Sequence, residues 1–220
     1  MTESSAPRSL LLVATRNAGK LRELRALFAN LGVDLVDLAA AGLPETPEED
    51  ALESYDTFES NALAKARHFH ALSGLPTVAD DSGLSVDALG GSPGVHSKRY
   101  AGVVGASPAV DAANNAKLQR ALAGAADRRA SFVCAAAFVD GGRETVARGE
   151  AAGRILDEAR GHEGFGYDPY FLSDDLGVTF AEASVAQKEG VSHRGRAFRA
   201  LVSALREAGW GAVDGPARTG

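Results

Sequence analysis

The chain begins with an apolar run that predicts a buried strand. Residues 9–15 read SLLLVAT, without the polar alternation of a half-exposed strand. In the following stretch, RNAGKLRELRALFANLG, leucines and a phenylalanine recur at helical spacing, and Gly32 is placed to end the helix. Residues 33–38, VDLVDL, alternate and predict a second strand. This strand–helix–strand order predicts an α/β protein built on a sheet.

The pattern then changes to an exposed connection and a second helix. Residues 39–56 are rich in acid and proline, which is typical of an exposed connection. A helix is predicted over residues 57–72, with Asp56 and Glu59 placed as a capping box. The next apolar run, LPTVAD, predicts a strand that ends at the adjacent aspartates Asp80 and Asp81.

The second half of the chain predicts one more helix, a hairpin and a final helix. Ser107 as N-cap and Pro108 at the first helical position open a helix that runs to about Leu122. The runs ASFVCAAAFVD and RETVARGE, separated by two glycines, predict a long β-hairpin. Further elements are expected at GRIL (a short strand), at 161–175 (a glycine-rich loop) and at 192–208 (the last helix, with Ser192 as N-cap).

Length and composition predict one domain over residues 1–220, with disordered tails at 1–8 and 211–220. The net charge of −6 argues against non-specific binding to nucleic acid. The single cysteine, Cys134, permits no internal disulfide and is expected to be a small buried side chain. No apolar run reaches the ~18 residues of a membrane helix, and no secretory signal is visible, so we expect no membrane contact and a cytoplasmic location.

The segment ATRNAGK, residues 14–20, is a candidate phosphate site. A strand ends, a polar loop turns, and a helix begins with Gly19 and Lys20 in its first turn. The N–H groups of a helix start favour anions, and Lys20 adds a full positive charge. The spacing of a Walker A loop is absent, and an ordinary helix capped by Asn17 remains an alternative.

The stretch VADDSGL places Asp80 and Asp81 side by side before several glycines. Two adjacent carboxylates are unfavourable unless water, a proton or a cation relieves them, and Mg²⁺ prefers carboxylate oxygens together with phosphate. Neighbouring strand residues point to opposite faces, so at most one carboxylate is expected to face a ligand. A polar surface turn is the alternative. The glycines that follow, Gly83, Gly90, Gly91 and Gly94, predict tight turns or a close approach of the backbone to a ligand.

Two later segments combine aromatic or basic residues with glycine. EGFGYDPYF, residues 163–171, could stack on a nucleobase or could anchor a loop in the core. QKEGVSHRGRAF carries Lys188, His193 and Arg194 near the start of the last helix, where an anion would relieve the positive charge. A solvated basic face is the alternative.

The order of these segments resembles the inosine triphosphate pyrophosphatase family, also called Ham1-like. The resemblance rests on ATRNAGKLREL, FESNALAKA, VADDSGL, GFGYDPYF and SHRGRA, and it covers about residues 10–205. It implies an elongated α/β fold with a mixed, twisted central sheet, flanking helices and two lobes around a substrate cleft. It implies hydrolysis of ITP, dITP and XTP to the monophosphate and pyrophosphate, a role in cleansing the nucleotide pool of deaminated purines, Mg²⁺ as cofactor, and a homodimer.

The same resemblance implies roles for individual residues. Asp81 would accept a proton and contact the metal with Glu53, and Lys20 would act in catalysis. His193 and Arg194 would read the edge of the base. The residues expected to bind substrate are Thr15, Arg16, Asn17, Ala18, Gly19, Lys20, Ser82, Phe165, Gly166, Tyr167, Asp168, Lys188, His193 and Arg194.

The chain departs from the family pattern at three places. Ser54 and Tyr55 follow Glu53 where Thr-Gly is common, Glu150 stands in a segment that is usually aromatic, and Gln187 replaces a common glutamate. Two other functions remain open from the residues. One is a non-catalytic nucleotide-binding sensor, and the other is a Maf-like pyrophosphatase acting on other modified nucleotides.

Overall fold

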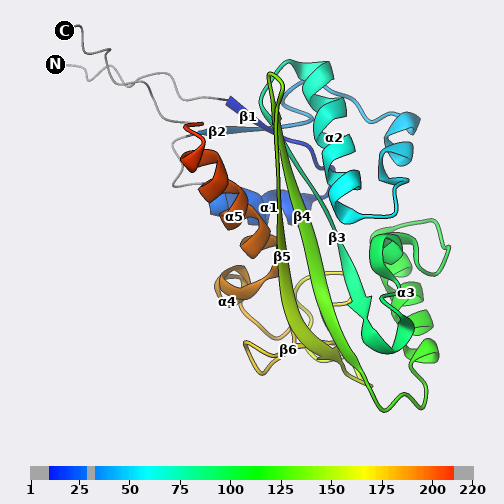
Figure 1. The fold of residues 1–220 in the computed structure, drawn as a ribbon. Helices are drawn as coiled ribbons and strands as arrows, with labels where there is room; N and C mark the ends of the chain where they lie inside the picture. Colours follow the sequence, from blue (N-terminus) through cyan, green and yellow to red (C-terminus); the bar gives the residue numbers. More distant parts are fainter. Residues whose placement is uncertain (1–9, 29–32, 211–220) are drawn as a thin grey trace, which may run out of the picture.

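The structure, a computed structural model, describes residues 10–28 and 33–210. Six strands form one mixed sheet in the order β2-β1-β3-β4-β5-β6, and helices flank it on both sides (Figure 1). β1 pairs in parallel with β2 and β3, and the pairs from β3 to β6 are antiparallel. The predicted mixed sheet with flanking helices is therefore confirmed.

The strands and helices have the following bounds along the chain. The strands are β1 (Leu10–Val13), β2 (Asp34–Asp37), β3 (Thr77–Val86), β4 (Arg129–Asp140), β5 (Arg143–Ile155) and β6 (Phe171–Ser173). The α-helices are α1 (Ala18–Phe28), α2 (Phe58–Ser73), α3 (Ser107–Ala121), α4 (Val185–Val191) and α5 (His193–Glu207). Three short 3₁₀ helices are η1 (Pro47–Glu53), η2 (Asp87–Leu89) and η3 (Gly94–Arg99).

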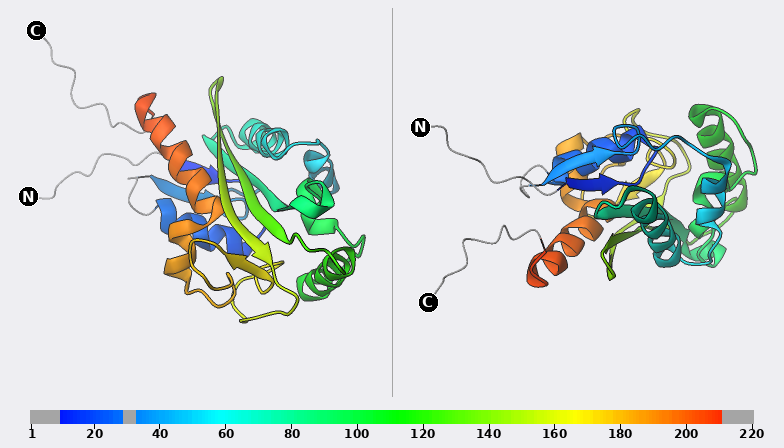
Figure 2. Two further views of the ribbon diagram at one scale, coloured as in Figure 1. Left: turned by 60° about the horizontal axis from the view of Figure 1, so that its bottom comes forward. Right: turned by 90° about the horizontal axis from the view of Figure 1, so that it is seen from above.

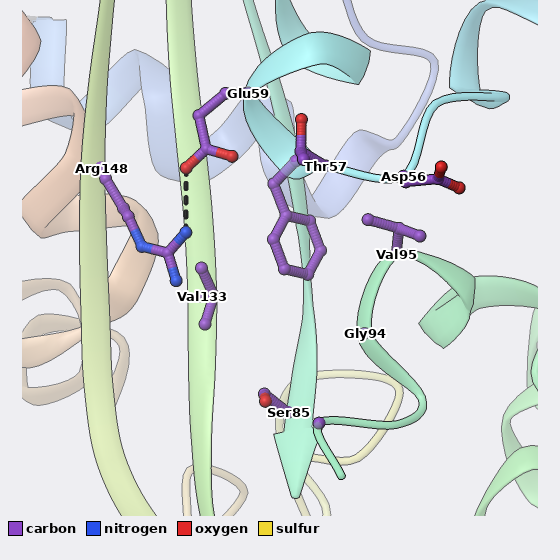
Figure 3. Close-up of a pocket in the computed structure, with 10 residues that line it drawn as sticks. Asp56, Thr57, Glu59, Ser85, Gly94, Val95, Val133 and Arg148 are labelled. Carbon is purple, nitrogen blue, oxygen red and sulfur yellow. Dashed lines mark hydrogen bonds and ion pairs between the residues drawn. The ribbon is translucent and has the colours of Figure 1, made fainter.

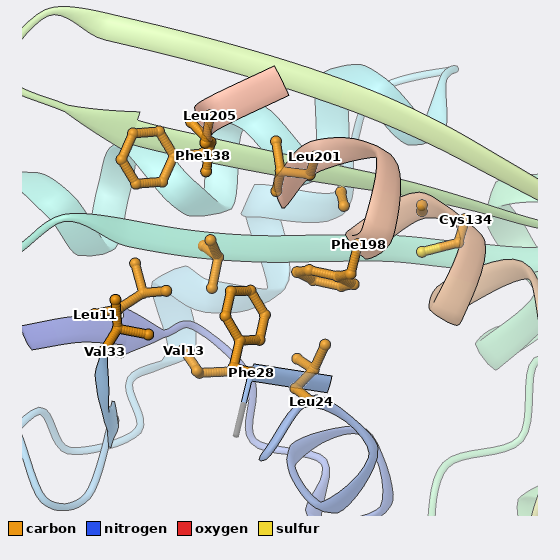
Figure 4. Close-up of a cluster of buried hydrophobic side chains, with 13 residues drawn as sticks. Leu11, Val13, Leu24, Phe28, Val33, Cys134, Phe138, Phe198, Leu201 and Leu205 are labelled. Atoms are coloured by element: carbon orange, nitrogen blue, oxygen red, sulfur yellow. The ribbon is translucent and has the colours of Figure 1, made fainter. Parts of the chain in front are cut away.

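The central strands are buried on both faces because helices cover each face. On one face α1 and α5 pack against alternate strand residues, and Leu24, Phe28 and Phe198 contribute to that core (Figure 4). On the other face α2 packs its Phe58 and Phe69 against the intervening strand residues. Figure 2 shows α5 and α2 on opposite sides of the sheet. Burial on both faces explains the unbroken apolar runs of β1 and β4.

A third core lies at the far end of the long β4–β5 hairpin. Leu118 and Leu122, from α3 and the residue that follows it, pack there with Tyr167, Phe171 and other residues. This cluster joins α3 to the loop before β6, so two segments about fifty residues apart share one core. It fixes the position of the glycine-rich loop that the sequence singled out.

Several predicted strand limits were wrong. β3 does not end at Asp80 and Asp81 but continues to Val86, because β4 pairs with it over its whole length. GRIL is not a separate strand; Gly153 to Ile155 complete β5. The stretch 161–175, expected to be loop, contains the short strand β6.

Two helix caps differ from prediction, and one helix was missed. Thr57, not Asp56, caps α2, and its hydroxyl accepts the N–H of Ser60. Ala106 precedes α3 and makes no side-chain cap, so Ser107 is already helical. The short helix α4 before Ser192 was not predicted, whereas Ser192 does cap α5 as expected, accepting the N–H of Gly195.

Two further predictions can be compared with the backbone. Gly83 has no room for a side chain, since a Cβ there would lie 2.3 Å from the carbonyl oxygen of Gly94. Gly90, Gly91 and Gly94 all have positive φ. The predicted tight turns are confirmed, whereas the close approach at Gly83 is to the backbone of Gly94, and an approach to a ligand stays a prediction. The predicted tails and the helix end at Gly32 lie outside the described residues.

Candidate active site

The two adjacent aspartates of β3 face opposite sides of the sheet. Asp80 is paired across the sheet with Ala136, which belongs to the core under α1 and α5. Asp81 is paired with Ala135, which belongs to the core under α2. The alternation of a strand thus sends each carboxylate to a different set of helices, as the sequence predicted.

Asp80 is a buried carboxylate held by two cations. Its Oδ2 lies 2.8 Å from Nζ of Lys20 on α1 and 3.2 Å from Nε of Arg194 on α5. Its Oδ1 is buried without a hydrogen-bond partner among the described residues. Burial alone would raise the pKa of Asp80, but Lys20, Arg194 and Lys65 hold the pKa well below its usual range. Asp80 is therefore a charged anchor for two of the predicted site residues.

Asp81 faces a second carboxylate, Glu53 at the end of η1. Its Oδ2 accepts a 2.9 Å hydrogen bond from Nδ2 of Asn61, and its Oδ1 accepts the backbone N–H of Ser82. Burial raises the pKa of Asp81, and the charge of Glu53 raises it further, against the opposing effect of Lys65. A carboxylate with a raised pKa holds a proton more readily, which suits a proton acceptor.

Lys65 connects the two carboxylate groups. It lies on α2 and is buried, and its Nζ donates to Oε1 of Glu53 and to the backbone oxygen of Asp80, each at 2.6 Å. Burial raises the pKa of Glu53, but Lys65, with Lys20 and Lys98, outweighs it and leaves the pKa below its usual value. Glu53 therefore remains ionised beside Asp81.

The carboxylates Glu53 and Asp81 fit a divalent cation. No group of three His, Cys, Asp or Glu side chains is gathered for a closed metal site within residues 10–28 and 33–210. Mg²⁺ is usually held by one or two carboxylates together with water and substrate phosphates. The two carboxylates lie close enough for the charge of Glu53 to raise the pKa of Asp81. These oxygen donors suit a hard cation shared with a phosphate.

The start of α1 lies beside this group, and nearby side chains cap its first backbone N–H groups. Oδ1 of Asn17 accepts the N–H of Gly19 and of Lys20, and Oγ1 of Thr15 accepts the N–H of Asn17. The side chain of Arg16 points away from this group. It donates to Glu49 and to carbonyl oxygens of the loop that follows β2. In this structure Arg16 tethers the segment that leads to Glu53, whereas Lys20 points to Asp80.

The glycine-rich loop places one aromatic ring at the surface and the others in the core. Tyr167 is 5% exposed and Phe171 is fully buried, whereas Phe165 is 39% exposed. A Cβ built on Gly19 would lie 3.2 Å from the ring of Phe165, so this ring covers the start of α1. Nζ of Lys188 lies 5.3 Å from the centre of the same ring.

Asp168 in this loop is buried and holds both Lys188 and the loop itself. Its Oδ2 lies 2.7 Å from Nζ of Lys188 and accepts the N–H of Phe165. Burial raises the pKa of Asp168 despite the attraction of Lys188. The hydroxyl of Tyr167 donates to the backbone oxygen of Ser97. The structure thus uses Tyr167 and Asp168 to shape the loop, and it leaves Phe165 and Lys188 at its outer side.

Arg194 binds groups from two elements, α1 and β3. Its Nη1 pairs with Glu23 of α1, its Nη2 donates to Oγ of Ser82 at 3.1 Å, and its Nε contacts Asp80. Glu23 also lies 3.7 Å from Nζ of Lys188. Of the predicted residues, Lys20, Ser82, Lys188 and Arg194 therefore belong to one connected network of charges.

His193 is buried beneath this network. Its ring stacks on Phe132 at 4.8 Å between centres, and its Nδ1 has no hydrogen-bond partner within the described part of the chain. Burial, together with Arg194 and Lys188, lowers the pKa of His193 well below its usual value. The ring is therefore neutral near pH 7 and offers one nitrogen as an acceptor and one as a donor.

The neutral, buried His193 predicts a pH-dependent loss of stability. Below about pH 6.5 the unfolded chain takes up a proton on this residue that the folded protein resists, so stability falls with pH down to the folded pKa. We expect His193→Phe to lose melting temperature less steeply than the wild type between about pH 6.5 and 5. Differential scanning calorimetry across this range measures it. The exposed His96 supplies the control, and His96→Gln should follow the wild-type slope; equal slopes for all three proteins would contradict the prediction.

Sequence reasoning missed Lys65, Asn61 and Glu23 as site residues. A signal for the first two was present, because Asn61 and Lys65 stand four residues apart on the stripe of α2 that also carries Phe58 and Phe69. Polar side chains on the buried stripe of a helix need partners there, and both find them in the carboxylate group. Glu23 lies one turn after Lys20 and had no comparable signal.

A surface pocket lies on the α2 side of the sheet, and its lining includes none of the predicted substrate or metal residues. It lies between the start of α2, the loop around Gly94 and Arg148 of β5, which pairs with Glu59 at 2.9 Å (Figure 3). With its one strong cation already paired, the pocket lacks the phosphate-binding groups found around Lys20. The candidate active site is therefore the network around Asp80 and Asp81.

The chain is similar to known proteins over most of its length. A model of the Ham1 family matches residues 11–204. The chain is 50% identical over 199 residues to a protein of Ralstonia nicotianae named dITP/XTP pyrophosphatase, covering 89% of this chain and 96% of that protein. It is 49% identical over 205 residues to one of the same name from Burkholderia pseudomallei, covering 92% and 96%.

Solved structures give the same answer for the fold. A HAM1 protein from Coxiella burnetii superposes with a TM-score of 0.78 at 36% identity, covering 90% of this chain and 99% of that one. A protein from Mycobacterium abscessus, titled nucleoside-triphosphatase or dITP/XTP pyrophosphatase, gives a TM-score of 0.69 at 43% identity, covering 90% and 100%. Since the family model spans nearly the whole described fold, and every segment that carried the resemblance lies within it, this chain belongs to the Ham1 family.

Proposed function

We propose that this chain hydrolyses dITP, ITP and XTP to the monophosphate and pyrophosphate and so removes deaminated purines from the nucleotide pool. The observation that carries the proposal is the similarity, over nearly the whole chain, to relatives named dITP/XTP pyrophosphatase. The arrangement of Lys20, Glu53 and Asp81 supports it. Hydrolysis of a triphosphate needs cations that balance the phosphate charge, and it needs a group that accepts a proton.

The reaction requires water to attack the α-phosphorus and pyrophosphate to leave. Asp81 would accept the proton of the attacking water, since its raised pKa brings its affinity for a proton closer to the operating pH. Lys20 would donate to the oxygens of the leaving pyrophosphate, beside the positive end of the α1 dipole. Lys65 would keep Glu53 ionised and in place.

We propose Glu53 and Asp81 as the ligands of Mg²⁺. Bound there, the cation would neutralise charge on the phosphate oxygens. When no cation and phosphate are bound, Lys65 would keep Glu53 in position.

Base selection would fall to the groups beside Phe165. Hypoxanthine and xanthine carry an acceptor oxygen at the position where adenine carries an amino group, so donors such as Arg194 favour the deaminated base. His193 would contribute a ring nitrogen, and Phe165 a face for stacking. Lys188 is placed between this ring and Asp168, where it would reach substrate from the same side.

We further propose that the protein acts as a homodimer in the cytoplasm, without a nucleic-acid or membrane partner. No helix in the described ranges 10–28 and 33–210 is both long and apolar enough to cross a bilayer. Light scattering coupled to size-exclusion chromatography tests the dimer. A mass near twice 22.7 kDa supports it, and a single-chain mass overturns it.

Pyrophosphate release from a panel of nucleotides tests the function. We expect rapid turnover of ITP, dITP and XTP with Mg²⁺, little turnover of GTP, ATP or dTTP, and loss of turnover with EDTA. Restoration by added Mg²⁺ is the control for chelation. Binding of nucleotides without turnover would instead support a sensor, and turnover of pyrimidine nucleotides alone would support a Maf-like activity.

A further inference from the structure

Two side chains of α3 grip a single residue of the glycine-rich loop. Oδ2 of Asp111 accepts the N–H of Gly166 at 2.9 Å, and Nδ2 of Asn115 donates to the carbonyl oxygen of the same Gly166 at 2.9 Å. Asp111 and Asn115 are four residues apart and so share one face of α3. Both polar groups of one peptide residue are thus bound by one helix.

The gripped residue stands next to the exposed ring of Phe165. Gly166 has a φ of +62°, a conformation in which glycine is unstrained but also free to move. Asp168 accepts the backbone N–H of Phe165 itself. The backbone that carries Phe165 is therefore held at Gly166 from α3 and at its own N–H by Asp168.

The hydrogen bonds from α3 to Gly166 include a buried side chain, so they are more than a surface contact. Asn115 is 8% exposed, and Leu118, which follows on the same helix, belongs to the core that also contains Tyr167. The anchor of the loop is therefore fixed to the body of the protein. Asp111 and Asn115 bind the backbone of Gly166, so their influence on the neighbouring ring of Phe165 passes through Gly166.

We propose that Asp111 and Asn115 are positioning residues that hold Phe165 in place to stack on the purine base. This inference rests on the proposed function and deepens it. It means that α3, a helix outside the catalytic network, positions the ring that stacks on the base. Within residues 10–28 and 33–210, no hydrogen bond or ion pair joins either residue to Lys20 or Asp81. Their loss is therefore expected to weaken the binding of substrate more than the rate of the bound complex.

The test compares KM and kcat for ITP in matched variants. Asp111→Leu removes the acceptor for Gly166 and is expected to raise KM about tenfold while kcat changes less than about twofold. Asp111→Asn keeps an oxygen that can accept the same N–H and is expected to restore a KM near wild type. Asn115→Ala removes the hydrogen bond to the carbonyl oxygen of Gly166. It replaces Asp111→Leu in the test if that variant does not fold. Arg120→Ala, an exposed change on the same helix, is the control.

A double variant shows whether the effect passes through Phe165. If Asp111 acts by positioning that ring, Asp111→Leu combined with Phe165→Ala should raise KM no further than Phe165→Ala alone. If the double variant instead raises KM by the product of the two single increases, the proposal is overturned. An unchanged KM in Asp111→Leu would also overturn it. So would a rise in KM for Asp111→Asn as large as the rise for Asp111→Leu.

Binding of inosine monophosphate separates this proposal from the proposed function. Isothermal titration of the wild type and Asp111→Leu does not require turnover. If the wild type fails to hydrolyse ITP, the proposed function is wrong; weaker binding by Asp111→Leu would still support the positioning role. Equal binding by both proteins, or no binding by either, would overturn it.

Discussion

Asp81→Asn is expected to lower kcat for ITP about 1000-fold, because the amide cannot accept the proton of the attacking water. The shape of the side chain is kept, and an amide oxygen can still accept from Asn61 or from the N–H of Ser82. The folded state should therefore survive, with a melting temperature close to that of the wild type. Initial rates of pyrophosphate release at saturating ITP and Mg²⁺ measure the effect.

The pH profile gives this prediction a second readout. The pKa of Asp81 is raised by burial and by Glu53, so the acid limb of kcat/KM should lie above the ~3.9 of a free aspartate. Activity falls as the pH drops through this limb, because protonated Asp81 cannot accept another proton. Asp157→Asn, at a carboxylate 85% exposed, is the control and should keep both the rate and the limb. Near-normal turnover by Asp81→Asn would remove Asp81 from the proposed role.

Asp80→Asn is expected to destabilise the folded protein by about 3–5 kcal/mol, because it leaves two buried or nearly buried cations without their shared carboxylate. Lys20 and Arg194 both contact Oδ2 of Asp80, and the lowered pKa of Asp80 shows that its charged form is favoured in the folded state. Urea unfolding, followed by circular dichroism, measures the change in the free energy of unfolding.

The matched control for Asp80 is a carboxylate whose arginine partner lies on the same helix, α5, as Arg194. Asp175 pairs with Arg196 at 2.9 Å, and both side chains are 39% exposed. Asp175→Asn should change the free energy of unfolding by less than about 1 kcal/mol, because water screens an exposed pair. Similar losses for the two variants would contradict the view that burial makes the Asp80 pairs important.

Much of the fold followed from periodicity and from turn residues. The strands and helices near both ends of the described chain were predicted because apolar residues alternate or recur there at helical spacing. The errors had a common cause, which is that contacts distant in sequence overrode local signals. β3 passes through Asp80 and Asp81 because β4 pairs with it there, and local sequence cannot reveal that pairing.

The candidate site was only partly accessible from the sequence. Its segments were recognised by their order and composition, and the opposite directions of Asp80 and Asp81 follow from strand geometry. The partners of each side chain did not follow. Lys65 beside Glu53, and Glu23 between Arg194 and Lys188, come from helices that approach the sheet from different sides.

The sequence by itself determined the class of the fold, the family of the chain and the residue types available for phosphate and metal chemistry. These follow from patterns carried by neighbouring residues and from motifs in a characteristic order. Only the tertiary structure decided which carboxylate is anchored and which faces a second carboxylate, and which aromatic ring of the glycine-rich loop is left exposed. Those distinctions depend on burial and on charges brought together from separate elements, because a pKa or a packing position is set by surroundings in space and not along the chain.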